Sequence, residues 1–304
     1  MQRHRLLAAA IVLAVAVGAI AATAHRETAE TTERAPIIYG PSSSVGGGTA
    51  RSYVEFDTAG APTSVGVELT AAALTKLAPR MNLTSRCFDR DGNGTLTHGE
   101  CIGDYQASLA LPDEANARGI PVRWISLNWN PEGHMKPAPP VWGASHFDFH
   151  FYIVPPEVIQ AIRPGGCAEI IDCDDFKTAQ VPLPAAHQPP GHLDVGAAVA
   201  AMGNHLIDRH DPELADPSRG FSRTFIYGAY GGRLIFLEPM VSLKYLSSKP
   251  AECTALRTPA SVEIPGYYPT RYCVRFDAPT SNYRVSLEGL VRRPLALGGV
   301  GGAE

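Results

Sequence analysis

The amino-acid sequence predicts an α+β fold rich in β-structure, an antiparallel barrel or sandwich that carries a short EF-hand-like helical insertion. Three observations support this prediction. The 304 residues include 29 glycines and 26 prolines, more than long helices tolerate. Short stretches with apolar residues at every second position recur along the chain, as in half-buried strands. Between two of these stretches, Gly231-Gly232 is a standard two-residue hairpin turn.

The N-terminus has the three parts of a signal peptide over residues 1–24. Arg3 and Arg5 form the basic region, Leu6–Ile20 the apolar region, and Ala22-Thr23-Ala24 a small-residue cleavage site. The alternative is an uncleaved anchor, because the apolar run is nearly long enough to span a bilayer. The Ala-x-Ala pattern leads into polar sequence, which favours cleavage. We therefore predict an exported protein, secreted or in the cell envelope, with no membrane span after cleavage.

Six cysteines are consistent with export to an oxidising compartment. They allow 15 connectivities, but they fall into sequence-local pairs, which we take as the first expectation. These pairs are Cys87 with Cys101, Cys167 with Cys173, and Cys253 with Cys273. None of the spacings is Cys-x-x-Cys, so zinc-ribbon and thioredoxin-like sites are disfavoured.

The remaining chain divides into a tether, a domain and a tail. Residues 25–50 are Thr/Glu-rich and then Ser/Gly-rich, so we expect a flexible tether. The β-rich domain spans residues 51–295, and the Gly-rich residues 296–304 are expected to be disordered. The predicted strands cover residues 53–57, 64–69, 122–129, 145–152, 224–230, 233–238, 261–264, 272–276 and 283–287. The predicted helices are short, at residues 71–77, 155–162 and 241–246, with a short helix or buried turn at 195–202.

Residues 89–100 match the twelve-residue EF-hand pattern at every diagnostic position. Gly94 falls where the backbone must turn sharply, Leu96 is expected to pack inward, and Thr97 can hold a water. The predicted calcium ligands are Asp89, Asp91, Asn93, Thr95 and Glu100. The alternative is a polar, glycine-rich loop whose acids coincide by chance.

A structural role is the expected use of this loop, which lies in an insertion over residues 81–111. Sensor EF-hands usually come in pairs, and this sequence has one such loop. Cys87 and Cys101 lie at its two ends, so a disulfide would preform the site and oppose the opening motion of a sensor. We therefore predict a Ca²⁺ staple with a dissociation constant of about 10⁻⁴–10⁻³ M.

The strand predicted at residues 145–152 has two different faces. Side chains alternate along a strand. His146, Asp148 and His150 therefore share one face, and the three phenylalanines between and after them share the other. The aromatic face is expected in the core, and the polar face has the residue types of a metal or proton-transfer site.

A transition-metal set is predicted from three histidines and one glutamate: His146, His150, His205 and Glu238. Nitrogen and oxygen ligands suit Zn²⁺ or another transition metal. Residues i and i+4 on a flat strand are about 13 Å apart, near the limit for one shared ion. Asp148 is therefore an alternative partner of either histidine, or an acceptor that orients one of them.

Other polar residues bear on this prediction. His134 is a reserve ligand, whereas His187, His192 and His210 lie in Pro- or Asp-rich loops and are expected at the surface. The alternative to a metal site is a buried polar network in which the histidines and acids bond to each other and to Tyr152 or Tyr227.

Several function classes have no support in the sequence. The net charge is −4 and no block of like charge occurs, so no nucleic-acid partner is expected. There is no Gly-x-Ser-x-Gly motif, P-loop or dinucleotide fingerprint.

Five segments carry a resemblance to a known group of proteins. They are residues 128–134 (NWNPEGH), 146–152 (HFDFHFY), 202–205 (MGNH), 225–230 (FIYGAY) and 236–240 (FLEPM). In order and spacing they resemble a family of exported bacterial proteins of unknown function, over residues 53 to 246. The resemblance implies that His146, His150, His205 and Glu238 belong together, but it implies no reaction.

The sequence thus predicts an exported calcium-binding protein with a histidine-lined metal pocket and a binding or envelope-associated role. The alternative is a metalloenzyme, a hydrolase or a cupin-like oxidoreductase, whose ion keeps an open coordination position. A third alternative is a structural subunit of a homo-oligomer with an inert polar interior.

Overall fold

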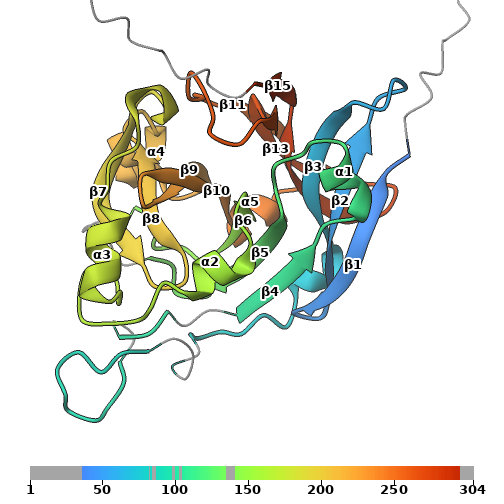
Figure 1. Ribbon diagram of the computed structural model, residues 1–304. Coiled ribbons are helices and arrows are strands. Elements are labelled where there is room, and N and C mark those ends of the chain that lie inside the picture. Colours follow the sequence, from blue (N-terminus) through green and yellow to red (C-terminus); the bar gives the residue numbers. More distant parts are fainter. Residues whose placement is uncertain are drawn as a thin grey trace, which may run out of the picture. The chain divides into compact units, whose positions relative to one another are not determined.

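Two antiparallel sheets packed as a sandwich make up most of the domain (Figure 1). The computed structural model describes residues 36–81, 83, 87–97, 100–102, 105–134 and 141–294. The predicted β-rich α+β class is confirmed, and of its two variants the structure is the sandwich. The predicted signal peptide and tail lie outside the described residues.

The first sheet has six strands, taken from the N-terminal and the C-terminal parts of the described chain. In spatial order they are β1 (Ile38–Val45), β2 (Gly48–Phe56), β3 (Pro62–Thr70), β14 (Asn282–Glu288), β13 (Arg271–Asp277) and β11 (Ala251–Ala255). The second sheet has seven strands: β4 (Tyr105–Ala110), β5 (Trp124–Asn130), β6 (His146–Tyr152), β10 (Arg233–Ser242), β9 (Arg223–Tyr230), β8 (Gly203–Asp208) and β7 (His192–Val199). A separate pair joins β12 (Gly266–Tyr268) and β15 (Val291–Arg293).

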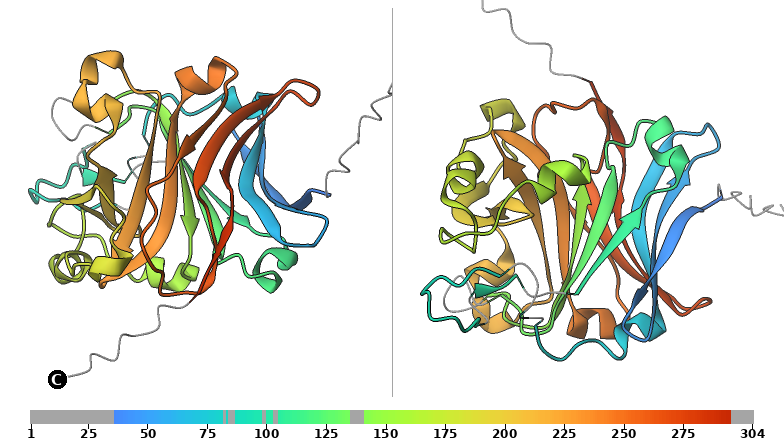
Figure 2. Two further views of the ribbon diagram at one scale, coloured as in Figure 1. Left: turned by 90° about the horizontal axis from the view of Figure 1, so that it is seen from above. Right: turned by 60° about the horizontal axis from the view of Figure 1, so that its bottom comes forward.

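The helices are short and lie at the ends and on the outer side of the sandwich (Figure 2). They are α1 (Asp113–Ala117), α2 (Pro156–Gln160), α3 (Cys173–Ala179), α4 (Pro212–Ala215) and α5 (Leu243–Ser247), with 3₁₀ turns η1 (Ala71–Leu74), η3 (Ala185–His187) and η4 (Pro217–Arg219). Described residues give no helix long and apolar enough to cross a membrane.

Strand β6 separates two apolar clusters. Phe147, Phe149 and Phe151 are fully buried between the sheets, against valines of the six-stranded sheet such as Val67 and Val285. The opposite face of the seven-stranded sheet carries the second cluster, which includes Tyr152 and Met240 and is covered by Ile159 of α2 and Ala179 of α3. The predicted aromatic core face is confirmed, and the polar face of β6 lies under this second layer.

The predicted tether is shorter than residues 25–50, because its second half forms β1. Ile38–Val45 pairs with β2 along the sheet edge, and Ser43 Oγ donates to Ser108 O of β4 at 3.4 Å. The serine-rich composition typical of a linker is here tolerated in an edge strand, where backbone pairing supplies the stability. Residues 25–35 lie outside the described part.

Four further local predictions differ from the structure. Residues 195–202 belong largely to β7, whose register shifts between Asp194 and Ala198, instead of forming a helix or turn. The helix expected at 71–77 is only the 3₁₀ turn η1. The strand expected at 261–264 is replaced by β12, and β10 continues to Ser242 before α5 begins. For β7 and for the end of β10, pairing with distant strands overrides the local preference.

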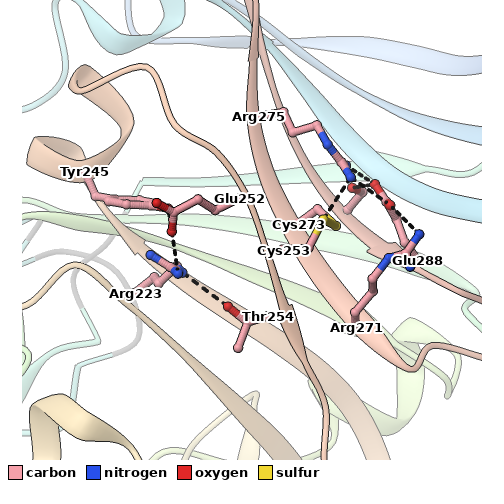
Figure 3. The surroundings of a disulfide bond; sticks show 10 residues. Arg223, Tyr245, Glu252, Cys253, Thr254, Arg271, Cys273, Arg275 and Glu288 are labelled. Carbon is pink, nitrogen blue, oxygen red and sulfur yellow. Dashed lines mark hydrogen bonds and ion pairs between the residues drawn. A yellow bond between two sulfur atoms is a disulfide. The ribbon is translucent and has the colours of Figure 1, made fainter.

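All three predicted disulfides are present: Cys87–Cys101, Cys167–Cys173 and Cys253–Cys273. The last joins directly paired residues of β11 and β13. Figure 3 shows Arg275 beside it, donating to Cys253 Sγ at 2.8 Å and to Glu288 Oε2 at 3.1 Å. Disulfides of this kind are typical of exported proteins.

Glu68 links three strands of the six-stranded sheet. Its carboxylate lies 2.6 Å from Arg51 Nη2 and 2.8 Å from Arg284 Nη2, and it accepts from Tyr39 at 3.2 Å. Burial raises the pKa of Glu68, but the hydrogen bonds from the two arginines outweigh it and leave the pKa below its ordinary value. Stability from this group is therefore present above about pH 4.3 and is lost as the pH falls through the lowered folded pKa.

We expect Glu68→Gln to lower the free energy of unfolding by about 2 kcal/mol at pH 7, the scale of a charged hydrogen bond. The difference from wild type should shrink when urea unfolding is repeated at about pH 3, below the ordinary carboxyl pKa. Glu263→Gln is the control, because the Arg233–Glu263 pair is 54% and 43% exposed and should contribute little. A pH-independent Glu68→Gln effect would contradict the prediction.

Candidate metal centre

The outer face of the seven-stranded sheet carries a row of buried polar side chains. Strand pairing places His146, Asp148 and His150 opposite Asn130, Asn128 and Ser126 of β5. On the other side, β10 pairs Met240 with Asp148 and Leu237 with Phe151, so Glu238 lies opposite His150. His205 comes from β8, two strands further along.

The structure divides the four predicted ligands between two groups. The inner group is His150, His205 and Glu238, and the rim group is His134, His146 and Asp148; within each, one ligand atom per residue lies within 4.8 Å of the others. The predicted four-residue set is thus divided, and His146 lies beside Asp148, the alternative partner that the sequence predicted for it. The separation of about 13 Å between residues i and i+4 of a flat strand is consistent with this division.

The inner group is almost completely buried. His150 Nε2 lies 3.3 Å from Glu238 Oε1, and His205 Nε2 lies 3.8 Å from Glu238 Oε2. The His150 and Glu238 side chains are 0% and 1% exposed, and that of His205 is 12% exposed. Two imidazoles and one carboxylate thus converge in an apolar surrounding.

The rim group has the same composition and is partly open. His146 Nε2 lies 3.1 Å from Asp148 Oδ1, and His134 Nε2 lies 3.5 Å from Asp148 Oδ2. Asn130 Nδ2 donates to Asp148 Oδ2 at 2.6 Å. The predicted reserve ligand His134 is therefore part of the site, and its side chain is 40% exposed.

Backbone carbonyls set the tautomer of two histidines. His146 Nδ1 lies 2.7 Å from Ala144 O, and His205 Nδ1 lies 2.9 Å from Ala197 O. A carbonyl oxygen only accepts, so Nδ1 of each ring carries a proton and Nε2 is the ring atom directed at the nearby carboxylate. Metal-binding histidines are commonly oriented in this way.

Three atoms in these contacts are buried polar atoms that need a partner. His146 Nε2, Asp148 Oδ1 and Glu238 Oε2 are buried and lack a well-formed hydrogen bond to any described residue. A lone pair facing a carboxylate oxygen is repulsive unless a proton or a cation lies between them. Buried polar atoms of this kind are rare and indicate a missing partner such as an ion.

The pKa values of the two buried acids are shifted in opposite directions. Burial, reinforced by the charge of Asp148, raises the pKa of Glu238 well above its usual range. Burial also acts to raise the pKa of Asp148, but the imidazoles of His146 and His134 outweigh it and hold that pKa well below its usual range. Burial lowers the pKa of His205 to about 4, so its ring is neutral at neutral pH. A neutral imidazole is the form that binds a metal ion.

Phe236 packs against both inner histidines. Its ring centroid lies 4.9 Å from that of His150 and 5.1 Å from that of His205. The ring covers Gly228 so closely that a Cβ at Gly228 would lie 2.1 Å from it. The apolar residues around the ligands are therefore packed against them, which fixes the ring orientations.

His192 and Tyr227 do not lie where the sequence led us to expect them. His192, expected at the surface, is buried with its ring 4.8 Å from that of Tyr227. Tyr227 belongs to the cluster between the sheets and donates to Arg257 O at 3.1 Å, so it takes no part in a polar network with the site. His187 is partly exposed and His210 exposed, as predicted.

The predicted calcium loop is described over residues 89–97 and at Glu100. One carboxylate oxygen each from Asp89, Asp91 and Glu100 lies within a 4.8 Å group. Glu100 accepts from Thr97 N at 3.0 Å and from Arg90 N at 2.9 Å, so the chain curls around this carboxylate. Asn93 and Thr95 lie on the same turn of chain, where Thr95 N donates to Asn93 Oδ1 at 2.7 Å.

Two features of the loop differ from the EF-hand pattern. Leu96 is 37% exposed and does not pack inward. The insertion has no α-helix among its described residues, and residues 105–110 form β4. The Cys87–Cys101 disulfide and the bond from Phe88 N to Glu100 O close the loop in place of paired helices.

We expect calcium at about 10 mM to raise the unfolding free energy by about 1.4–2.7 kcal/mol for a dissociation constant of 10⁻⁴–10⁻³ M. Glu100→Ala should abolish this gain, because it removes the bidentate ligand. The measurement is the melting temperature with Ca²⁺ and with chelator. Glu114→Ala, an exposed acid of α1, should keep the full shift; an undiminished shift in Glu100→Ala would refute the site.

No protein-family model, curated protein or solved structure matches this chain in sequence or structure comparison. The resemblance to a family of exported bacterial proteins stays a prediction.

Proposed function

We propose that this chain is an exported metalloprotein whose inner group, His150, His205 and Glu238, binds one transition-metal ion. The observation that carries the proposal is the orientation of His205. Its Nδ1 is engaged by Ala197 O, so its Nε2 lone pair faces a buried carboxylate that also contacts His150. A cation at this point would satisfy all three groups together.

The ligand set limits the identity of the ion. Two imidazole nitrogens and a carboxylate oxygen suit Zn²⁺, Mn²⁺ or Fe²⁺ better than Ca²⁺, which prefers oxygen ligands. The protein supplies three ligands, and a tetrahedral ion would have one further position. The calcium loop, by contrast, is built from oxygens and is proposed to hold Ca²⁺ as a structural staple.

A binding role is proposed ahead of catalysis because the inner ligands are nearly inaccessible. Their side chains are between 0% and 12% exposed. A metalloenzyme is the second candidate, since two histidines and one carboxylate also make hydrolytic zinc sites and non-haem iron sites. Export is proposed from the N-terminal sequence, and the three disulfides support it.

Metal analysis of the purified mature protein tests the proposal. We expect close to one transition-metal ion per chain at the inner group. His205→Ala should lower the metal affinity by more than about 100-fold, because loss of a direct ligand should exceed the loss of affinity caused by removing a residue that only orients a ligand. His187→Ala, a partly exposed histidine outside both groups, should bind as wild type does. Calcium as the sole metal, with His205→Ala as stable as wild type, would reject the inner site.

A further inference from the structure

We propose that the rim group, His134, His146 and Asp148, binds a second divalent transition-metal ion beside the inner one, so that the centre holds two ions. This inference rests on the proposed function of the inner group and extends it. The rim ion is a separate site, with its own two imidazoles and carboxylate, and shares no ligand with the inner group.

The rim group has the same arrangement as the inner group, in which a histidine Nδ1 is bonded to a backbone carbonyl and Nε2 points to a carboxylate. Ala144 O holds Nδ1 of His146, so Nε2 points to Asp148 Oδ1 at 3.1 Å. Both of these atoms are buried and lack a well-formed hydrogen bond to a described residue. A divalent ion between Nε2 and Oδ1 would give both buried atoms a partner.

A neighbouring side chain directs the carboxylate of Asp148. Asn130 Nδ2 donates to Oδ2 at 2.6 Å, which leaves Oδ1 directed at His146. Asn130 and His146 are paired across β5 and β6, so the sheet itself sets this geometry. His134 completes the group from the chain just after β5, with its ring centroid 4.6 Å from that of His146.

Strand register places the two groups side by side. Asp148 and His150 are two residues apart on β6, which corresponds to about 7 Å, and point to the same face. Glu238 lies opposite His150 and therefore diagonal to Asp148, a relation of about 7–8 Å between Cα atoms. The carboxylates of the two groups thus share one sheet face, the arrangement needed for two neighbouring ions.

Access differs between the two ions. The His134 side chain is 40% exposed, whereas the inner side chains are at most 12% exposed. The rim ion is therefore the one that water or an oxygen-donor ligand from solution reaches, and the inner ion is enclosed.

The experiment counts ions in the full mature chain. Protein stripped with chelator is reloaded with Zn²⁺, and zinc and calcium are measured separately per chain. We expect two zinc ions in wild type and one each in His134→Ala and Glu238→Gln. His134 is partly exposed, so His134→Ala should fold. Asp148→Asn provides a second rim variant, in which the side chain keeps its size. Loading with Mn²⁺ should give the spin-coupled resonance signal of neighbouring ions in wild type and an uncoupled signal in His134→Ala.

The outcomes distinguish a failure of the proposed rim ion from a failure of the proposed inner ion. One zinc in wild type, kept by His134→Ala and lost by Glu238→Gln, overturns the rim ion and leaves the inner site. One zinc that is lost by His134→Ala and kept by Glu238→Gln overturns both the two-ion centre and the inner site. No zinc overturns both, and two zinc ions with uncoupled Mn²⁺ signals overturn the shared centre.

Discussion

Replacing Glu238 with glutamine is expected to abolish the stabilisation of the domain by Zn²⁺ at the inner group. An ion at about 1,000 times its dissociation constant stabilises the folded state by about 4 kcal/mol. Glutamine keeps the shape of the side chain but removes the charge that balances the ion. In metal-free protein the same substitution should cost little, because burial already disfavours the charged form of Glu238 and raises its pKa.

Urea unfolding checks this expectation. Wild type and Glu238→Gln are each measured with zinc and with chelator, which gives four samples. Glu157→Gln, an exposed carboxylate of α2, is the matched control and should respond to zinc as wild type does. Equal zinc responses in wild type and Glu238→Gln would show that Glu238 is not a ligand. A large loss of stability in the chelated Glu238→Gln protein would instead indicate a purely structural role.

Phe149→Ala is expected to lower the free energy of unfolding by about 3–5 kcal/mol, the range for large-to-small changes in a close-packed core. Phe149 is 0% exposed and packs between the sheets. For a domain of this size the melting temperature should fall by roughly 10 °C. Because the ligands lie on the opposite face of β6, the protein that remains folded should keep its metal content.

Leu193→Ala is the control for this change. Leu193 is 43% exposed on the edge strand β7, so its truncation should stay within about 0.5 kcal/mol. Similar losses for both variants would contradict the assignment of the phenylalanine face to the core. Loss of metal from folded Phe149→Ala protein would contradict the separation of the two faces.

Local sequence was sufficient for several features that the structure confirms. Alternation along residues 146–152 assigned the phenylalanines to the core, because the two-residue period of a strand requires no distant information. The Gly231-Gly232 turn was predictable in the same way, since both residues have positive φ (59° and 74°) and glycine adopts it without strain. The three disulfides followed from closeness along the chain.

The composition of the candidate metal centre was predictable only in part. Four of its six residues were predicted as one ligand set with Asp148 as an alternative partner, whereas the structure places His146 with Asp148 and His134. The pairing depends on which residue of β10 faces His150 and on β8 lying two strands from β10. Strand order and register are set by packing over the whole sheet, and a window of neighbouring residues contains no record of them.

Tertiary packing also explains the remaining differences. β1 and β7 are edge strands whose composition is typical of linkers or turns, and distant partners hold them in the sheets. His134 joins the rim group from the connection between β5 and β6, and His192, the first residue of β7, is buried beside Tyr227 of β9. Residue types and their period thus indicated a metal-binding face on β6, whereas its division into an inner and a rim group depends on strands that meet only in the folded sheet.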